Sequence, residues 1–328
     1  MKSAIRQFLV AACLTALTPL AANASLQTLS NLFVFGDSLS DGGNAPFAFP
    51  PPPYAASRYS NGPTAVEYLW QSYNPANLGG FTPSTQGGTN YALGGATTGT
   101  FNFNYINPGV PSSIQPYFLG QGGIANQVAQ FSGSCTGCFA PATSLFVVWG
   151  FPNDVFSNAA FGLPPDTLIG NGITNIANAI LTLASEGAMH FLVPNMPNLG
   201  ATPSFRGTSE AVGLTLLTQF FNAALASTLS QLDQALAAEI VQFDIYGAVE
   251  GVVQNPSAYG FTNVTDQCVE NLLNGQCNPD TWLFWDGVHP TTAGHRLLGS
   301  QFAAAVPEPA TLALLALGLL GIAAGRRR

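Results

Sequence analysis

The chain contains short, mainly apolar runs, separated by longer stretches in which apolar residues recur at helical spacing. The runs cover residues 32–35, 143–149, 190–193 and 239–243, and a glycine, proline or aspartate follows each of them. Mainly apolar runs of this length are typical of strands in a buried parallel sheet. We therefore predict strands at these four positions.

The stretches between the runs predict helices. Residues 123–131 have the length of a short helix, residues 166–186 form a longer one that stops at Gly187, and residues 209–238 place apolar side chains at helical spacing. Repeated strand–helix units imply a parallel sheet with right-handed crossovers and helices on both faces. The predicted fold class is therefore α/β, with three layers in the order α/β/α.

Both ends of the chain differ from this pattern. Residues 1–24 combine two basic residues, an apolar stretch at 8–20 and the small-x-small sequence Ala22-Asn23-Ala24. This combination is typical of a secretory signal peptide rather than of a membrane span, so the mature chain is expected to begin near residue 25. A single domain is then expected over residues 25–305.

The C-terminal segment, residues 306–328, begins with Pro307-Glu308-Pro309, continues as an apolar helix and ends in three arginines. One interpretation is a weak membrane anchor, because the apolar part is shorter than the roughly 20 residues of a comfortable span. The three parts in this order also resemble a PEP-CTERM sorting signal. That resemblance implies export from a Gram-negative bacterium, transient membrane association through this helix, removal by an exosortase-type sorting enzyme, and residence at the cell surface or in the extracellular matrix.

Removing both ends changes the charge of the chain. Of the eight basic and 16 acidic residues, three arginines and 15 acidic residues remain, which gives a net charge of −12 and leaves no lysine. A nucleic-acid partner and an anionic membrane surface are both disfavoured by such a balance.

Four of the five cysteines lie in the predicted domain: Cys135, Cys138, Cys268 and Cys277. Export makes disulfides the expected state, and two local bridges, 135–138 and 268–277, are the most economical of the three possible pairings. A zinc site is the weaker alternative, because the second pair is spaced differently and no histidine is near either pair. We therefore expect no metal and no cofactor.

Ser38 is the first candidate for chemistry. It follows the strand predicted at 32–35, and the carboxyl ends of parallel strands are where open α/β sheets bind ligands. A serine at such a place is more often a helix N-cap than a nucleophile, so the rest of the chain has to supply a base. The candidates are His190, His289 and His295.

Among these histidines, His289 has an acidic neighbour at a useful distance. Asp286 lies three residues before it, so that its carboxylate can hold the imidazole in one orientation. Pro290 disfavours a helical conformation for His289 and places the pair on a loop before a helix. His190 opens a predicted strand and His295 lies on the last helix, so both are expected to be ordinary packing or surface histidines.

The residues around these positions form four blocks: FGDSLSDGGN from residue 35, GTNYALGGAT from 88, VVWGFPND from 147 and WDGVHP from 285. In this order, with RYSNGPTAVEYL at 58–69, they resemble the GDSL esterases and lipases of the SGNH hydrolase superfamily. The resemblance implies a flavodoxin-like fold with a mainly parallel, five-stranded sheet. It also implies Ser38 as nucleophile with Asp286 and His289, and an oxyanion hole made by Ser38, Gly95 and Asn153.

The third block departs from the family pattern, because Phe151 stands where the family usually has glycine and Pro152 follows it. This predicts a different shape for the loop that carries Asn153. Asp37 and Asp154, next to the proposed site, are expected to brace loops as hydrogen-bond acceptors. The proline-rich loop at 46–61 follows the nucleophile segment and is expected to border the site.

These features together predict a secreted serine esterase or lipase that hydrolyses acyl esters or lipids through a Ser-His-Asp triad and an acyl-enzyme. Two alternatives remain open at this point. The same residues could transfer the acyl group to an alcohol or a polysaccharide hydroxyl, or the chain could be a non-catalytic matrix or surface protein on the same fold.

Overall fold

The computed structural model describes residues 26–306 except 27, 121 and 273. The predicted signal segment at 1–24 and all but the first residue of the C-terminal segment at 306–328 lie outside the described residues. The predicted hydrolase domain is therefore the part of the chain whose structure follows.

A parallel sheet of four strands forms the centre of the molecule. Its strands are β1 (Asn31–Gly36), β2 (Ser144–Trp149), β3 (His190–Pro194) and β4 (Glu239–Phe243), in the spatial order β1-β2-β3-β4. All four coincide with the apolar runs in the sequence. The first three strands are almost wholly buried, which explains why their sequences carry no polar alternation.

The expected fifth strand is replaced by an irregular edge. Residues 89–93 run parallel to β1 on the side away from β2, and three backbone hydrogen bonds join the two: Val34 N to Thr89 O (3.2 Å), Tyr91 N to Val34 O (2.8 Å) and Leu93 N to Gly36 O (3.1 Å). The ladder is interrupted at Gly36, whose N–H donates to Gln127 Oε1 at 2.8 Å instead of to this edge segment. With this edge counted as a strand, the strand order is flavodoxin-like. Among the described residues, the sheet contains four regular strands.

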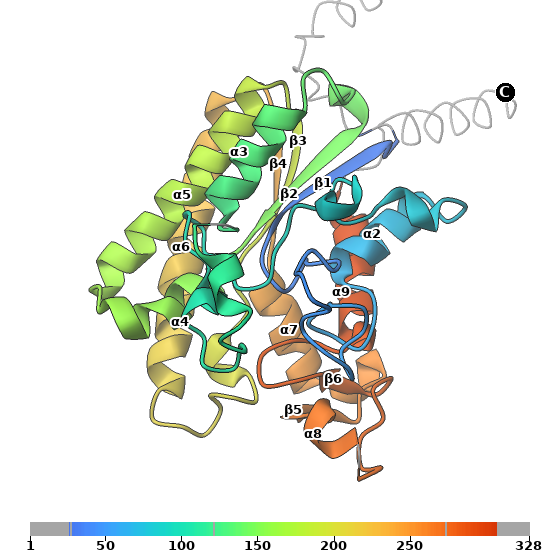
Figure 1. The fold of residues 1–328 in the computed structure, drawn as a ribbon, viewed down its shortest axis with the longest axis vertical. Helices are drawn as coiled ribbons and strands as arrows, with labels where there is room; N and C mark the ends of the chain where they lie inside the picture. Colours follow the sequence, from blue (N-terminus) through green and yellow to red (C-terminus); the bar gives the residue numbers. More distant parts are fainter. Residues whose placement is uncertain (1–25, 27, 121, 273, 307–328) are drawn as a thin grey trace, which may run out of the picture.

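Helices cover both faces of the sheet and complete the three layers (Figure 1). Phe33 and Phe35 of β1 face α3 (Ile124–Ser134), α5 (Pro165–Ser185) and α6 (Ala211–Ala235). Leu32 and Val34 point the other way, toward α2 (Ala65–Tyr73), α7 (Ile245–Gln254) and α9 (Thr292–Ala305). Successive residues of a strand point to opposite faces, so one apolar run fills both cores.

A small unit that the sequence did not predict follows α7. It consists of β5 (Asn263–Gln267), α8 (Cys268–Leu272) and β6 (Trp282–Phe284), with β5 and β6 paired in parallel. Helix α8 is tied to the chain beyond β6, because Val269 N donates to Trp285 O at 2.8 Å. The unit therefore supports the segment that carries Asp286 and His289.

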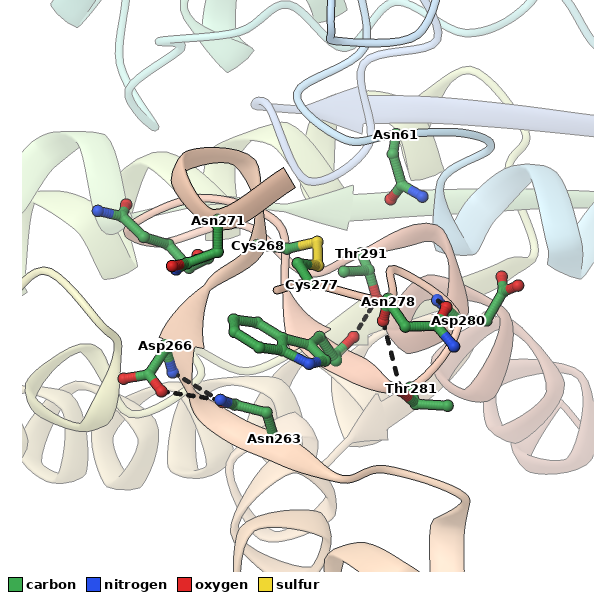
Figure 2. Close-up of a disulfide and its surroundings, with 12 residues drawn as sticks. Asn61, Asn263, Asp266, Cys268, Asn271, Cys277, Asn278, Asp280, Thr281 and Thr291 are labelled. Atoms are coloured by element: carbon green, nitrogen blue, oxygen red, sulfur yellow. Dashed lines mark hydrogen bonds between the residues drawn. A yellow bond between two sulfur atoms is a disulfide. The ribbon is translucent and has the colours of Figure 1, made fainter. Parts of the chain in front are cut away.

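Both predicted disulfides are present. Cys135–Cys138 closes the end of α3, with the two Cα atoms 5.1 Å apart, and Cys268–Cys277 joins α8 to the loop before β6, with a Cα separation of 5.3 Å. Figure 2 shows the second bridge beside the hydrogen bonds from Asn263 to Asp266 and from Thr281 to Asn278. Within the described residues, no cluster of three or more histidine, cysteine or acidic side chains is arranged to hold a metal ion.

Candidate active site

Ser38 lies in a tight turn at the carboxyl end of β1. Ser40 N and Asp41 N both donate to Asp37 O, at 3.1 and 3.0 Å, which folds the chain back directly after the strand. Gly36 lets the end of β1 approach β2 closely, because a Cβ at that position would lie 2.6 Å from the carbonyl oxygen of Trp149. The Ser38 side chain is thereby held at the sheet edge, and the residue is only 9% exposed.

His289 and Asp286 lie on a closed loop between β6 and α9. Trp285 N donates to His289 O at 2.8 Å, and Thr291 N donates to Leu283 O at 2.8 Å, so that the loop returns on itself. Asp286 Oδ1 accepts hydrogen bonds from the backbone N–H groups of Val288 (2.9 Å) and His289 (2.8 Å). As predicted, the pair precedes the helix rather than lying inside it.

These two segments, 251 residues apart, bring three side chains into one hydrogen-bonded chain. His289 Nε2 lies 2.7 Å from Ser38 Oγ, and His289 Nδ1 lies 2.8 Å from Asp286 Oδ2. This is the order of nucleophile, base and orienting acid in serine hydrolysis.

The charges of the pair support each other. Burial by itself would raise the pKa of Asp286, but His289 and the two backbone donors hold that pKa below its ordinary value. Burial likewise opposes the charged form of His289, yet the neighbouring carboxylate raises the pKa of the imidazole above its ordinary value. The loop is thus built to stabilise a protonated His289 beside an ionised Asp286.

The proline-rich loop borders the site as expected, and it contributes a residue that no motif indicated. Tyr54 donates its hydroxyl to Asp286 Oδ2 at 3.0 Å, and its ring packs edge-on against Trp285. Burial raises the pKa of Tyr54, so the phenol stays a donor at neutral pH. In the sequence, only the aromatic residues of the loop at 46–61 indicated that it could contact the site in this way. Tyr59 of the same loop packs against the His289 ring at 5.3 Å.

Gly95 and Asn153 reach the same place from two other segments. Gly95 has a φ of +82°, and a side chain there would collide with Asn102. Asn153 belongs to α4 (Pro152–Phe161) and donates to the carbonyl oxygen of Ala96 at 3.1 Å. Both residues line one cavity of about 120 Å³ together with Ser38 and His289. The four predicted blocks therefore meet around a single space.

Two aspartates, the half-buried Asp154 and the fully buried Asp41, brace these segments, as was expected for Asp154. Asp154 accepts from the Thr98 backbone N–H at 2.9 Å and from the Thr98 hydroxyl at 2.7 Å, which ties α4 to the Gly95 loop. Asp41, which the sequence did not single out, accepts from Gly94 N at 2.8 Å and so ties the first block to the second. Burial raises the pKa of each carboxyl to about 6.

Asp37 is another buried carboxyl at the site. Its Oδ1 accepts from Leu39 N at 3.0 Å, as a loop-bracing group would. Its Oδ2 is buried without a hydrogen-bond partner in the described part of the chain. Burial raises the pKa of Asp37 to about 7, because the carboxylate has lost its water.

The backbone conformation of Phe151 shows how the third block accommodates its departure from the family pattern. Its backbone has a φ of +119°, which glycine adopts easily and a bulky residue rarely does. The ring is fully buried and lies flat on Phe221 of α6, with centroids 3.8 Å apart and planes 4° from parallel. The other neighbour is Gly172 of α5, where a side chain would collide with the ring. Packing from two helices therefore holds a glycine-like conformation two residues before Asn153.

The remaining histidines have packing roles, as expected. His190 Nδ1 lies 3.1 Å from Glu239 on the adjacent strand. His295 Nδ1 accepts from the backbone N–H of Ala65 at 3.2 Å, and burial lowers the pKa of this imidazole to about 3. A neutral His295 joins α9 to the start of α2.

Two family profiles match the sequence. GDSL-like Lipase/Acylhydrolase matches residues 32–302, and the PEP-CTERM protein-sorting motif matches residues 305–328. The structural neighbours include the acetylxylan esterase Axe2 from Geobacillus stearothermophilus (14% identity, TM-score 0.47, covering 87% of this chain and 97% of that one). The hydrolase LAE5 from a Lake Arreo metagenome is similar at 13% identity and TM-score 0.48, over 85% of this chain and 96% of that one.

Curated relatives align over most of the chain. An uncharacterized protein from the trpE-trpG intergenic region of Pseudomonas putida is 29% identical over 87% of this chain, which spans 50% of that protein. The GDSL esterase/lipase At5g55050 of Arabidopsis thaliana is 26% identical, with 85% of this chain and 86% of the plant protein aligned. The thermolabile hemolysin of Vibrio parahaemolyticus is 23% identical over 83% of this chain and 63% of its own length.

Proposed function

The chain belongs to the GDSL-like lipase/acylhydrolase family, and on that basis we propose that it is a secreted serine esterase that hydrolyses carboxylic acyl esters. The observation that carries the proposal is the contact of 2.7 Å between Ser38 Oγ and His289 Nε2, with Asp286 on the far side of the imidazole. A serine, a base and an orienting carboxylate in this order are what acyl transfer requires.

In the first half-reaction, Ser38 Oγ attacks the carbonyl carbon of the ester while His289 Nε2 takes the hydroxyl proton. Asp286 accepts the Nδ1 hydrogen bond, keeps the free nitrogen toward Ser38 and stabilises the imidazolium. His289 then passes the proton to the departing alcohol oxygen, and the acyl group remains on Ser38. In the second half-reaction water attacks this acyl-enzyme with His289 as base, and the acid leaves.

The negative charge that develops on the carbonyl oxygen of the substrate has to be stabilised by hydrogen-bond donors. The backbone N–H groups of Ser38 and Gly95 and the side-chain amide of Asn153 are assigned to this role. One N–H of the Asn153 amide already bonds Ala96 O, which orients the group and leaves its second N–H for the oxyanion. Removing one such donor typically lowers turnover by about 10²–10³.

The two terminal segments determine where the reaction takes place. The PEP-CTERM motif indicates export in a Gram-negative bacterium with C-terminal processing. We extend this to removal of residues 1–24 by signal peptidase and of the tail by an exosortase-type enzyme, with transient membrane association in between. The mature enzyme would then act at the cell surface or in the extracellular matrix.

Fluorophosphonate labelling together with p-nitrophenyl ester hydrolysis tests the proposal. The wild-type chain is expected to label and to hydrolyse the ester, whereas Ser38→Ala should do neither. Ser40→Ala is the matched control, because this serine lies in the same turn and its hydroxyl has no partner among the described residues. A Ser38→Ala variant with near wild-type activity contradicts the mechanism. Release of acylated alcohol instead of free acid, when an alcohol is added, would identify an acyltransferase.

A further inference from the structure

A second cavity lies directly behind the candidate active site. It has a volume of about 30 Å³ and shares three wall residues with the catalytic cavity: Leu39, Pro197 and Val288. Leu39 follows the proposed nucleophile in the sequence, and Val288 precedes the proposed base. Two of the three shared wall residues therefore flank the reacting groups in the sequence.

The walls of this second cavity are almost wholly apolar. They come from the end of β2, from α7, from β6 and from α9, and the buried wall residues are Trp149, Ile245, Val252, Leu283, Phe284 and Leu298. No charged residue lines the cavity. Such walls bind alkyl groups and reject anything that needs a hydrogen bond.

The polar side chains at its rim are already engaged. Asn198 donates to Glu250 at 2.9 Å and accepts from Thr215 at 2.9 Å, while the Thr202 hydroxyl donates to Leu199 O at 2.7 Å. These contacts turn the polar groups toward each other and toward the backbone. They leave a methylene chain as the fitting occupant.

We propose that the second cavity is a subsite for the distal carbons of the substrate's acyl chain, and this proposal rests on the esterase function proposed above. The acyl group rather than the alcohol belongs there because the alcohol has to leave first, whereas the acyl chain stays bound until water releases it. An interior pocket suits the group that remains.

The volume of the second cavity determines the expected gain in kcat/KM. One water-sized group occupies about 10–15 Å³ in such a cavity, so 30 Å³ accommodates about two methylene groups. Burying two methylene groups is worth a gain of about 15-fold in kcat/KM. We therefore expect one step of this size in a chain-length series, at the length where the acyl chain passes Val288, and little gain beyond it.

The test compares p-nitrophenyl acetate, butyrate, hexanoate and octanoate on the full chain and on two variants that fill the cavity from opposite walls. Ala201→Leu adds a side chain from the loop after β3, and Val253→Phe adds bulk from α7. The control, Ala258→Leu, makes the same change as the first variant at an exposed position outside the cavity. Both filling variants should lower the ratio of kcat/KM for the longer esters to that for acetate by at least fivefold, and the control should keep the wild-type ratio.

The outcomes separate this proposal from the one on which it rests. Unchanged ratios in both filling variants, with hydrolysis still dependent on Ser38, overturn the subsite and leave the esterase standing. The same variants are also assayed on acetates of alcohols of increasing length. A change confined to that series would place the alcohol in the cavity and also overturns the proposal. Hydrolysis that survives Ser38→Ala refutes the esterase mechanism itself.

Discussion

Phe151→Ala and Phe151→Gly should both lose the packing of the buried ring, but only Phe151→Gly should relieve the backbone strain at this position. Either change removes a fully buried ring that lies 3.8 Å from Phe221. Deleting a buried phenylalanine ring costs about 3–5 kcal/mol of unfolding free energy. Alanine keeps a Cβ at a φ of +119°, whereas glycine adopts that conformation without strain.

The difference between the two variants isolates the backbone contribution. A non-glycine residue in such a conformation costs of order 1–3 kcal/mol, and the greater freedom of glycine in the unfolded chain offsets about 0.4–1 kcal/mol of the relief. Phe151→Gly should therefore be more stable than Phe151→Ala by about 0.5–2 kcal/mol. Urea unfolding of both variants measures this difference.

A buried alanine in a regular helix provides the matched control. Ala179 in α5 is 5% exposed, and Ala179→Gly should show the usual direction, a loss of about 0.5–1 kcal/mol. If Phe151→Gly were less stable than Phe151→Ala by a similar amount, the strained conformation at position 151 would be refuted.

The same substitution also tests whether the ring positions Asn153. Without the ring the first turn of α4 can shift, so kcat should fall with little change in KM. Asn153→Ala sets the limit, about 10²–10³ for one lost oxyanion donor. Phe151→Ala combined with Asn153→Ala should lose no more kcat than Asn153→Ala alone, because both changes act on one amide. Losses that multiply would show that the ring acts elsewhere.

Three further predictions follow from the site and the chain ends. Since the base has to be neutral, kcat/KM should rise with pH through the pKa of His289. Asp286→Asn removes the charge that raises this pKa, so the rising limb of the pH–rate profile should move to lower pH. The same variant should lower kcat by roughly 10⁴. A profile that stays in place would contradict the pairing. Peptide mapping without reductant should link Cys268 to Cys277, and Cys277→Ser should lower the unfolding free energy by roughly 2–3 kcal/mol; free thiols in exported protein would refute the bridge. A chain of residues 25–305 should be soluble and as active per mole as the full-length protein, and an unfolded or inactive truncation would move the domain boundary.

The sequence alone determined what depends on neighbours along the chain. The mainly apolar runs placed β1 to β4, and the near-complete burial of β1 to β3 explains why these three runs carry so few polar residues. The turn after β1 and the loop from Asp286 to His289 are local, so their motifs carried the geometry. The disulfides were predictable for the same reason, since each closes a short loop.

Only the tertiary structure decided how distant segments meet. Tyr54 reaches Asp286 across 232 residues, and Phe151 takes a glycine-like conformation because Phe221 and Gly172 enclose its ring. Gln127 of α3 interrupts the ladder between β1 and the expected fifth strand by accepting a hydrogen bond from Gly36 N, a contact that no periodicity reveals. The apolar cavity behind Val288 arises where four elements meet. Such features depend on the packing of side chains brought together by the whole fold, and a linear pattern records each residue's polarity but not its partner.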